Sequence, residues 1–107
     1  MEDKTIFVNT EHLTIYQNFA GEIRFGPEYI TLRSEPEIKE LQNKIFGVWF
    51  YRTERGIFLQ QWNSLAKPKS NLVYIDFQVL KFKIIETEID SVSWEMKEDK
   101  DNFFLYI

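Results

Sequence analysis

Short apolar runs, each closed by turn residues, follow one another along the chain, and this spacing restricts the fold more than any other sequence feature. Several runs alternate apolar with polar side chains, which is the period of two expected for a strand with one buried face. Glycine, proline, asparagine and acidic residues stand between the runs and favour tight turns. The pattern predicts a β-meander, in which consecutive strands pair antiparallel.

Nine segments carry this strand pattern. They span residues 5–9, 13–19, 22–25, 29–33, 46–53, 57–62, 72–85, 92–96 and 103–107. Turns are expected at Ala20–Gly21 and at 26–28. The stretch Asn63–Asn71 shows neither the strand period of two nor the helical period of 3.6, and it is predicted to be an exposed loop. The last segment, Phe103–Ile107, is expected to pair inside the domain, because an exposed edge of that composition would promote aggregation.

One segment, residues 34–45, instead carries the signals of a short helix. Ser34 and Glu37 have the spacing of a capping box, in which the hydroxyl and the carboxylate satisfy free backbone amides of the first turn. Pro36 suits that first turn, where an N–H group is not needed. Three apolar residues then recur at helical spacing, namely Ile38, Leu41 and Ile45. Gly47 is expected to end the helix.

A hairpin is predicted between segments 46–53 and 57–62. Its loop is Glu54-Arg55-Gly56, with Gly56 in the left-handed conformation that glycine adopts at no steric cost. This loop would place Thr53 opposite Ile57. The same register pairs Tyr51 with Leu59 and Trp49 with Gln61.

The segment Leu72–Ile85 is too long for one straight strand, because its apolar pattern changes phase. Ile75 and Phe77 belong to the first apolar set, whereas Leu80 and Phe82 belong to a second set on the opposite face. A bulge, a break or a crossing between sheets near residues 78–80 would bury both sets. We therefore expect the side chains of the two lysines in this region, Lys81 and Lys83, to point to solvent.

Together these signals predict an α+β domain. It consists mainly of one antiparallel sheet of about eight or nine strands, strongly curved or closed into a barrel-like sandwich, with the helix packed on it. Aromatic residues make up 17% of the chain, and their side chains suit the half-buried surface of a sheet. The length of 107 residues is typical of one domain, so residues 1–107 are expected to form a single β-rich unit.

Composition excludes several functional classes. The chain has no cysteine, which rules out disulfides, thiolate nucleophiles and thiolate metal sites. A net charge of −4 is unfavourable for general binding to nucleic-acid phosphates. No apolar run approaches the ~20 residues of a membrane span, and no signal peptide or lipidation motif is present. A cytoplasmic protein that binds neither nucleic acid nor membrane is the expectation.

Catalytic and metal-binding patterns are weak. The single histidine, His12, lies beside Glu11 in a predicted turn and is expected to be exposed, without the oriented partner that a general base needs. One histidine provides no cluster for a metal, and the serines lack the strand–turn–helix setting of a nucleophile. We expect no cofactor, no metal and no catalytic residue.

Two acidic stretches are predicted to be turns. The first is Glu86–Asp90, where Glu86, Glu88 and Asp90 would share one face if extended; the second, Lys97–Asn102, contains Glu98, Asp99 and Asp101. Neither stretch has the ligand spacing of a calcium loop. We expect the carboxylates to form solvated turns; the alternatives are an acidic docking patch for a basic partner and a cation site.

The functional prediction is a non-enzymatic protein-binding module, such as an inhibitor or immunity-type protein. The predicted contact residues are Trp62 and Asn63, at the mouth of the long loop, and the acidic residues Glu86, Glu88 and Asp90. The alternatives are a small-ligand-binding β-barrel and a carboxylate-based acid–base enzyme. An enclosed aromatic cavity would favour the barrel, acids converging in a cleft would favour the enzyme, and neither feature would favour a partner surface.

Overall fold

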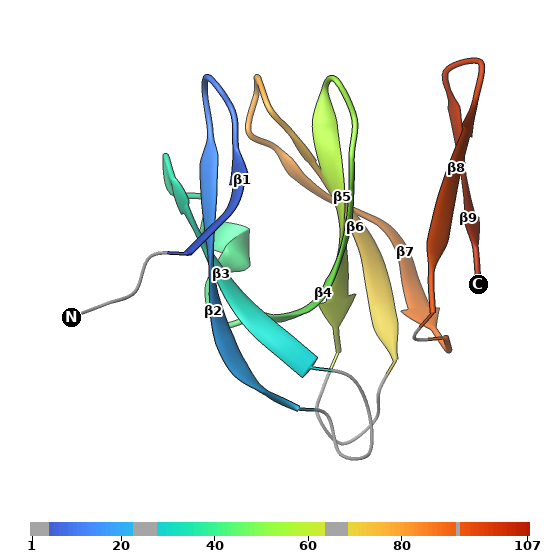
Figure 1. Ribbon diagram of the computed structural model, residues 1–107, viewed down its shortest axis with the longest axis horizontal. Coiled ribbons are helices and arrows are strands. Elements are labelled where there is room, and N and C mark those ends of the chain that lie inside the picture. The colour runs from blue at the N-terminus through green and yellow to red at the C-terminus, as the bar shows by residue number, and fades with distance from the viewer. Residues whose placement is uncertain (1–4, 23–27, 64–68, 92) are drawn as a thin grey trace.

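The computed structural model describes residues 5–22, 28–63, 69–91 and 93–107 (Figure 1). Its strands are β1 (Thr5–Asn9), β2 (Thr14–Glu22), β3 (Glu28–Glu35), β4 (Ile45–Arg52), β5 (Gly56–Trp62), β6 (Ser70–Asp76), β7 (Phe82–Ile89), β8 (Glu95–Asp99) and β9 (Asn102–Tyr106). A single 3₁₀ turn, η1 (Lys39–Leu41), lies between β3 and β4. The described residues contain no helix that is long and apolar enough to cross a membrane.

The strands confirm the antiparallel meander. In the larger sheet, β1 to β7 follow one another in sequence order, and each pairs antiparallel with the next. β8 and β9 form a separate two-stranded sheet. The prediction of a barrel or a strongly curved sheet is wrong, because closure requires the first and last strands to pair. Here β1 and β7 remain at opposite edges of an open sheet.

The predicted helix over residues 34–45 is also wrong. β3 continues through Glu35 because it pairs with β2 as far as Thr14↔Glu35, so the capping serine is part of a strand. The Ser34 hydroxyl accepts a hydrogen bond from the Ile38 amide at 2.9 Å and donates to the Pro36 carbonyl at 2.8 Å. The peptide bond between Glu35 and Pro36 is cis. These contacts build a tight turn that leads into η1, and Ile38 and Leu41 are buried as the pattern required.

Gly47 and Gly56 have roles different from those predicted. Gly47 does not end an element but lies inside β4, where a Cβ atom would collide with the side-chain amide of Gln60. Gly56 does not adopt a positive φ and is the first residue of β5. A Cβ atom there would collide with the Ile75 carbonyl oxygen and with the Tyr74 ring. Both glycines allow a neighbouring strand to approach closely.

The β4–β5 hairpin has a register one residue away from the prediction. Arg52 faces Ile57, Tyr51 faces Phe58 and Phe50 faces Leu59, and an irregularity then separates these pairs from Phe46↔Gln61. The cause is Thr53, whose hydroxyl accepts hydrogen bonds from the amides of Arg55 and Gly56 at 3.2 and 3.0 Å. The Thr53 backbone amide also donates to the Gly56 carbonyl at 2.8 Å, so the loop contains only Glu54 and Arg55, one residue fewer than predicted.

The predicted break near residues 78–80 is confirmed, although it is neither a bulge nor a crossing between sheets. β6 ends at Asp76, and the chain reverses so that Phe82 in β7 lies opposite Ile75 in β6. Leu80 adopts a positive φ of 56° within this reversal. Lys81 and Lys83 are exposed, as expected.

Several predicted boundaries move. β2 passes through the predicted Ala20–Gly21 turn with a register shift, and β6 begins at Ser70, inside the predicted loop. The predicted turn Glu86–Asp90 is mostly strand β7, and the predicted turn Lys97–Asn102 shrinks to Lys100 and Asp101, both with positive φ. The final strand pairs inside the chain as predicted, and its partner is β8. The expected strand at 22–25, the turn at 26–28 and the middle of the loop after Asn63 lie wholly or mainly outside the described residues.

The larger sheet has a different hydrophobic cluster on each face. One cluster joins strands β1 to β3 with strands β4 to β6 and includes the two buried residues around η1. Its most buried members are Leu13, Ile15, Phe46, Ile57, Leu59, Val73 and Ile75. The other cluster is formed by Phe58, Leu72 and Ile89 beneath residues of the C-terminal hairpin, namely Trp94, Met96 and Leu105. The β8–β9 hairpin therefore covers part of the second face.

Candidate binding surface

The structure brings together two of the predicted contact residues, Asn63 and Glu88, from separate segments. The Asn63 side-chain amide donates to Glu88 Oε1 at 2.9 Å, and the Lys69 ammonium lies 3.8 Å from Glu88 Oε2. The Asn63 backbone amide also donates to the Lys69 carbonyl at 2.9 Å. Glu88 adopts a positive φ of 58° where β7 bulges, and its own amide donates to the Asn71 side chain. The Glu88 carboxylate is thus held by Asn63 and Lys69, which directly follow β5 and directly precede β6.

The remaining predicted residues differ in exposure. Glu86 and Asp90 are exposed beside Glu88, and we call Asn63, Glu86, Glu88 and Asp90 the acidic edge. Trp62, by contrast, is only 2% exposed. Its indole Nε1 is buried without a hydrogen-bond partner among the described residues. Trp62 therefore does not present its ring to a partner.

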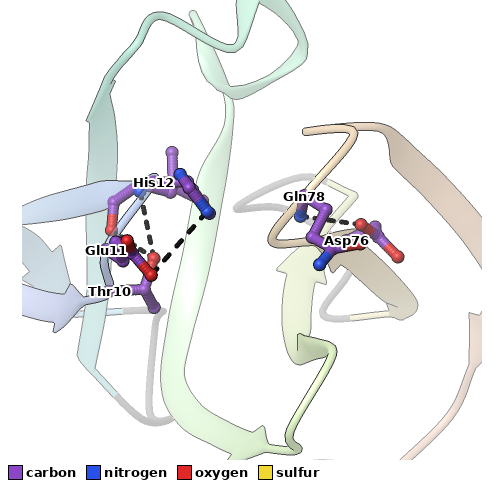
Figure 2. A network of polar contacts seen from close by, with 6 residues as sticks. Thr10, Glu11, His12, Asp76 and Gln78 are labelled. Carbon is purple, nitrogen blue, oxygen red and sulfur yellow. Dashed lines mark hydrogen bonds and ion pairs between the residues drawn. The ribbon is translucent and has the colours of Figure 1, made fainter.

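His12 lies in the exposed β1–β2 turn, as predicted (Figure 2). Its Nε2 is 3.9 Å from Glu11 Oε2, and both side chains are more than half exposed. Thr10 closes this turn through hydrogen bonds of its hydroxyl with the backbone of Leu13. The described residues contain no group of three or more metal-ligating side chains that could hold an ion.

Figure 2 also shows the β6–β7 turn, which Asp76 stabilises. Asp76 Oδ1 accepts hydrogen bonds from the amides of Gln78 and Val79 at 2.8 and 3.0 Å. These bonds, led by that of Val79, hold the pKa of the Asp76 carboxyl below its usual value of 3.8. Burial acts in the opposite direction, and the Arg55 guanidinium adds a smaller lowering effect.

An aromatic row crosses the face of the sheet that the C-terminal hairpin covers. Tyr51, Phe58, Tyr74 and Lys83 stand opposite one another on β4, β5, β6 and β7, so their side chains share this face. The ring centroid of Phe103, from β9, lies 5.4 Å from that of Phe58 and 6.2 Å from that of Tyr51. The hairpin therefore covers the β4–β5 end of the row, and a hollow remains beside Tyr74 and Lys83.

This hollow, which we call the apolar basin, has a volume of about 420 Å³. Its lining residues are Phe58, Tyr74, Asp76, Val79, Lys81, Lys83, Ile85 and Phe103. Three of the apolar side chains are accessible to solvent: Val79 is 71% exposed, Ile85 46% and Phe103 36%. Lys81 and Lys83 add positive charge to this otherwise largely hydrophobic lining.

A second hollow, the acidic basin, shares two lining residues with the first, Tyr74 and Phe103. It has a volume of about 480 Å³, and its other lining residues are Thr53, Glu54, Arg55, Glu98 and Asp101. The β4–β5 turn and the tip of the β8–β9 hairpin supply these groups, and both lie at the same end of the molecule (Figure 1). The Tyr51 hydroxyl lies 3.5 Å from Glu98 Oε2, on the inner side of this basin. We call the two basins together the hairpin groove.

A third hollow lies on the other face, between the segment around η1 and β7. It has a volume of about 650 Å³ and is lined by Lys39, Glu40, Gln42, Lys44, Gln61, Phe82, Lys83 and Ile84. Gln61 is buried in its floor, and the side-chain Oε1 has no hydrogen-bond partner among the described residues. Like the two basins of the hairpin groove, this cleft opens to solvent and is not an enclosed cavity.

The hairpin groove was not predictable from the sequence because it arises from long-range packing. Its floor belongs to three consecutive strands, but its wall is the β8–β9 hairpin, whose position depends on contacts such as that of Trp94 with Trp49 at 5.1 Å. The available signal was the aromatic alignment of Tyr51, Phe58 and Tyr74, which requires the correct register of the β4–β5 hairpin. With the register off by one residue, this alignment is lost.

Comparison with known proteins identifies no relative. The chain matches no family model, no curated protein and no solved structure. Its function is therefore inferred from the surfaces described above.

Proposed function

We propose that this chain is a non-enzymatic protein-binding module and that the hairpin groove is its main contact surface. The observation that carries the proposal is the apolar basin, which is lined by the exposed side chains of Val79, Ile85 and Phe103 together with charged residues. An apolar patch surrounded by polar groups is typical of a protein-interaction site. An inhibitor or immunity-type protein would act through such a surface without catalytic residues.

The open sheet favours a binding surface over the ligand-binding barrel. A barrel that holds a small molecule encloses it between strands, whereas the described hollows open to solvent and lie outside the main core. The carboxylate enzyme would need acids that converge on a substrate, and Glu98 and Asp101 do line one basin. Arg55 lines the same basin, so we interpret these acids as a charged rim for a partner.

The acidic edge supports a second contact surface, for a basic region of the partner. Asn63 and Lys69 hold the Glu88 carboxylate, and Glu86 and Asp90 extend the negative charge along the end of β7. A charged group held in place loses little conformational entropy when a partner binds. This surface retains four of the contact residues predicted from the sequence, whereas the fifth, Trp62, is buried.

The proposal is tested by affinity capture from the source organism with three forms of the protein. The wild type is compared with Ile85→Asp, which places a charge in the apolar basin, and with Phe19→Asp, a matched control at an exposed position on β2. Phe19 is 66% exposed, so this control also adds a carboxylate at an accessible apolar position. Loss of one specific partner with Ile85→Asp alone supports the groove as the contact surface. Equal capture by all three forms contradicts it.

A further inference from the structure

The two ends of the hairpin groove carry opposite charge. The acidic basin is lined by three carboxylates, those of Glu54, Glu98 and Asp101, against the single guanidinium of Arg55. In the apolar basin the ammonium groups of Lys81 and Lys83 outnumber the carboxylate of Asp76. Asp76 Oδ1 already accepts two backbone hydrogen bonds, which leaves the lysines as the freer charges at that end.

We propose that the hairpin groove binds an extended peptide segment of a partner protein, with a basic side chain in the acidic basin, an apolar side chain over Tyr74 and Phe103, and an acidic side chain beside Lys81 and Lys83. This inference rests on the proposed function and adds the chemistry of the partner. Tyr74 and Phe103 are the residues that the two basins share, so an apolar side chain there would lie between the two charged ends. Complementary charge at both ends fixes the direction of the bound segment.

The dimensions of the sheet set the spacing of the three side chains. Lys83 stands opposite Tyr74 on the neighbouring strand, at a strand separation of about 4.8 Å. The β4–β5 turn is at least one further strand away on the other side. An extended chain advances about 3.3 Å per residue, and alternate side chains point the same way. A basic, an apolar and an acidic residue at every second position therefore span about 13 Å, which suits the groove when long side chains reach the charges.

The charge pattern disfavours a nucleic acid as the occupant of this groove. A phosphate backbone repeats one negative charge along its length, and the three carboxylates of the acidic basin would repel it. An acidic peptide would meet the same repulsion at that end. A segment with one basic and one acidic residue satisfies both ends.

The test uses labelled synthetic peptides and fluorescence anisotropy with the full chain. The proposed peptide contains Arg-Ser-Leu-Ser-Glu and is measured together with its reversed sequence, which covers both chain directions. The control peptide replaces both charged residues with glutamine. We expect one of the two charged peptides to bind ~10-fold more tightly than the neutral control at low salt, and we expect this difference to shrink at high salt.

Protein variants then locate the binding site. Lys81→Glu with Lys83→Glu should weaken binding of the charged peptide ~10-fold, and should favour a peptide in which arginine replaces the glutamate. The matched control is Lys39→Glu with Lys44→Glu, a pair of exposed lysines at the third hollow. Equal affinity of charged and neutral peptides, or equal weakening by both lysine pairs, overturns the inference. If Ile85→Asp still abolishes capture of the partner in that case, the proposed function stands and only the peptide chemistry is wrong.

Discussion

Asp76 shows how one side chain directs the chain reversal between β6 and β7. Its Oδ1 accepts hydrogen bonds from two backbone amides of the turn. In addition, the Phe77 amide donates a hydrogen bond to the Arg55 carbonyl at 2.8 Å. The second contact ties the β6–β7 turn to the β4–β5 turn. Because amides stabilise the ionised carboxylate, the turn is coupled to the protonation of Asp76.

Asp76→Asn should lower stability in a pH-dependent way. The pKa of Asp76 is lower in the folded than in the unfolded state, so its stabilisation is present above the unfolded value near 3.8 and is lost as pH falls through the folded value. We expect a loss below about 1 kcal/mol at pH 7, since the carboxylate is partly accessible to solvent. Urea midpoints of the two proteins should converge as the pH falls below the folded-state pKa, which lies under 3.8. A constant difference between the midpoints at all pH values would contradict the coupling.

Phe82 and Lys81 are neighbours whose truncation should have unequal effects. Phe82 is half-buried against the main core, and Lys81 is exposed. We expect Phe82→Ala to lower the free energy of unfolding by about 2–3 kcal/mol, less than for a fully buried phenylalanine, and Lys81→Ala to change it by no more than about 0.5 kcal/mol. Chemical denaturation of both variants checks the order. A larger loss with Lys81→Ala would mean that the two faces of β7 are reversed.

Exposure of single residues was predictable where the local pattern was unambiguous. The turn position of His12 and the change of apolar phase before Lys81 were sufficient to place both side chains in solvent. Trp62 was misjudged as a surface residue because it ends an apolar run, and the sequence does not show whether the final ring points inward. Its burial depends on the packing of β5 between β4 and β6.

Among the elements, the failed helix and the correct strand break show which local signals are reliable. The capping pattern of Ser34 and Glu37 lost to strand pairing, since β3 gains cross-strand hydrogen bonds with β2 up to Glu35. The break in 72–85 was predictable because no straight strand buries both apolar sets. A pattern that fixes side-chain faces is therefore more informative than a pattern that fixes only a helix cap.

Gly47 and Gly56 give a prediction about β5 and its neighbours. Gly56→Ala should destabilise the protein by about 1–3 kcal/mol, because the added Cβ meets the backbone carbonyl of Ile75, which cannot move without shifting β6. Gly47→Ala should have a smaller effect, since the group it meets is the flexible end of Gln60. Thermal denaturation of both variants measures the order. A greater loss from Gly47→Ala would show that Gln60 is fixed in place.

At the scale of the whole molecule, the sequence predicted the strand succession but not the arrangement of the sheets. Apolar runs separated by turn residues were sufficient to predict an antiparallel meander, because strands that are neighbours in the sequence are also neighbours in the sheet. The open edges, the separate β8–β9 hairpin and the hairpin groove depend on contacts between distant segments, such as those of Phe103 with Phe58. Those contacts leave no periodic trace in the sequence.

The charge of the acidic edge yields a prediction for association with a basic partner. Glu86→Lys with Glu88→Lys should slow association ~10-fold at low salt and should flatten the dependence of the rate on ionic strength, without unfolding the domain. The matched control is Glu11→Lys with Glu40→Lys, which reverses two exposed carboxylates elsewhere. Stopped-flow association rates with the captured partner provide the measurement. A wild-type rate that does not vary with salt would exclude electrostatic steering by this surface.

Both outermost strands of the larger sheet are irregular. The register of β1 slips between Ile6 and Val8, and the register of β7 slips twice, each time with an extra residue on β7. A fibril grows when each incoming strand finds a straight row of free amides and carbonyls on the strand before it. Neither edge offers such a row, so the sheet resists polymerisation even though large apolar side chains on both strands, among them Ile6 and Ile84, contact water.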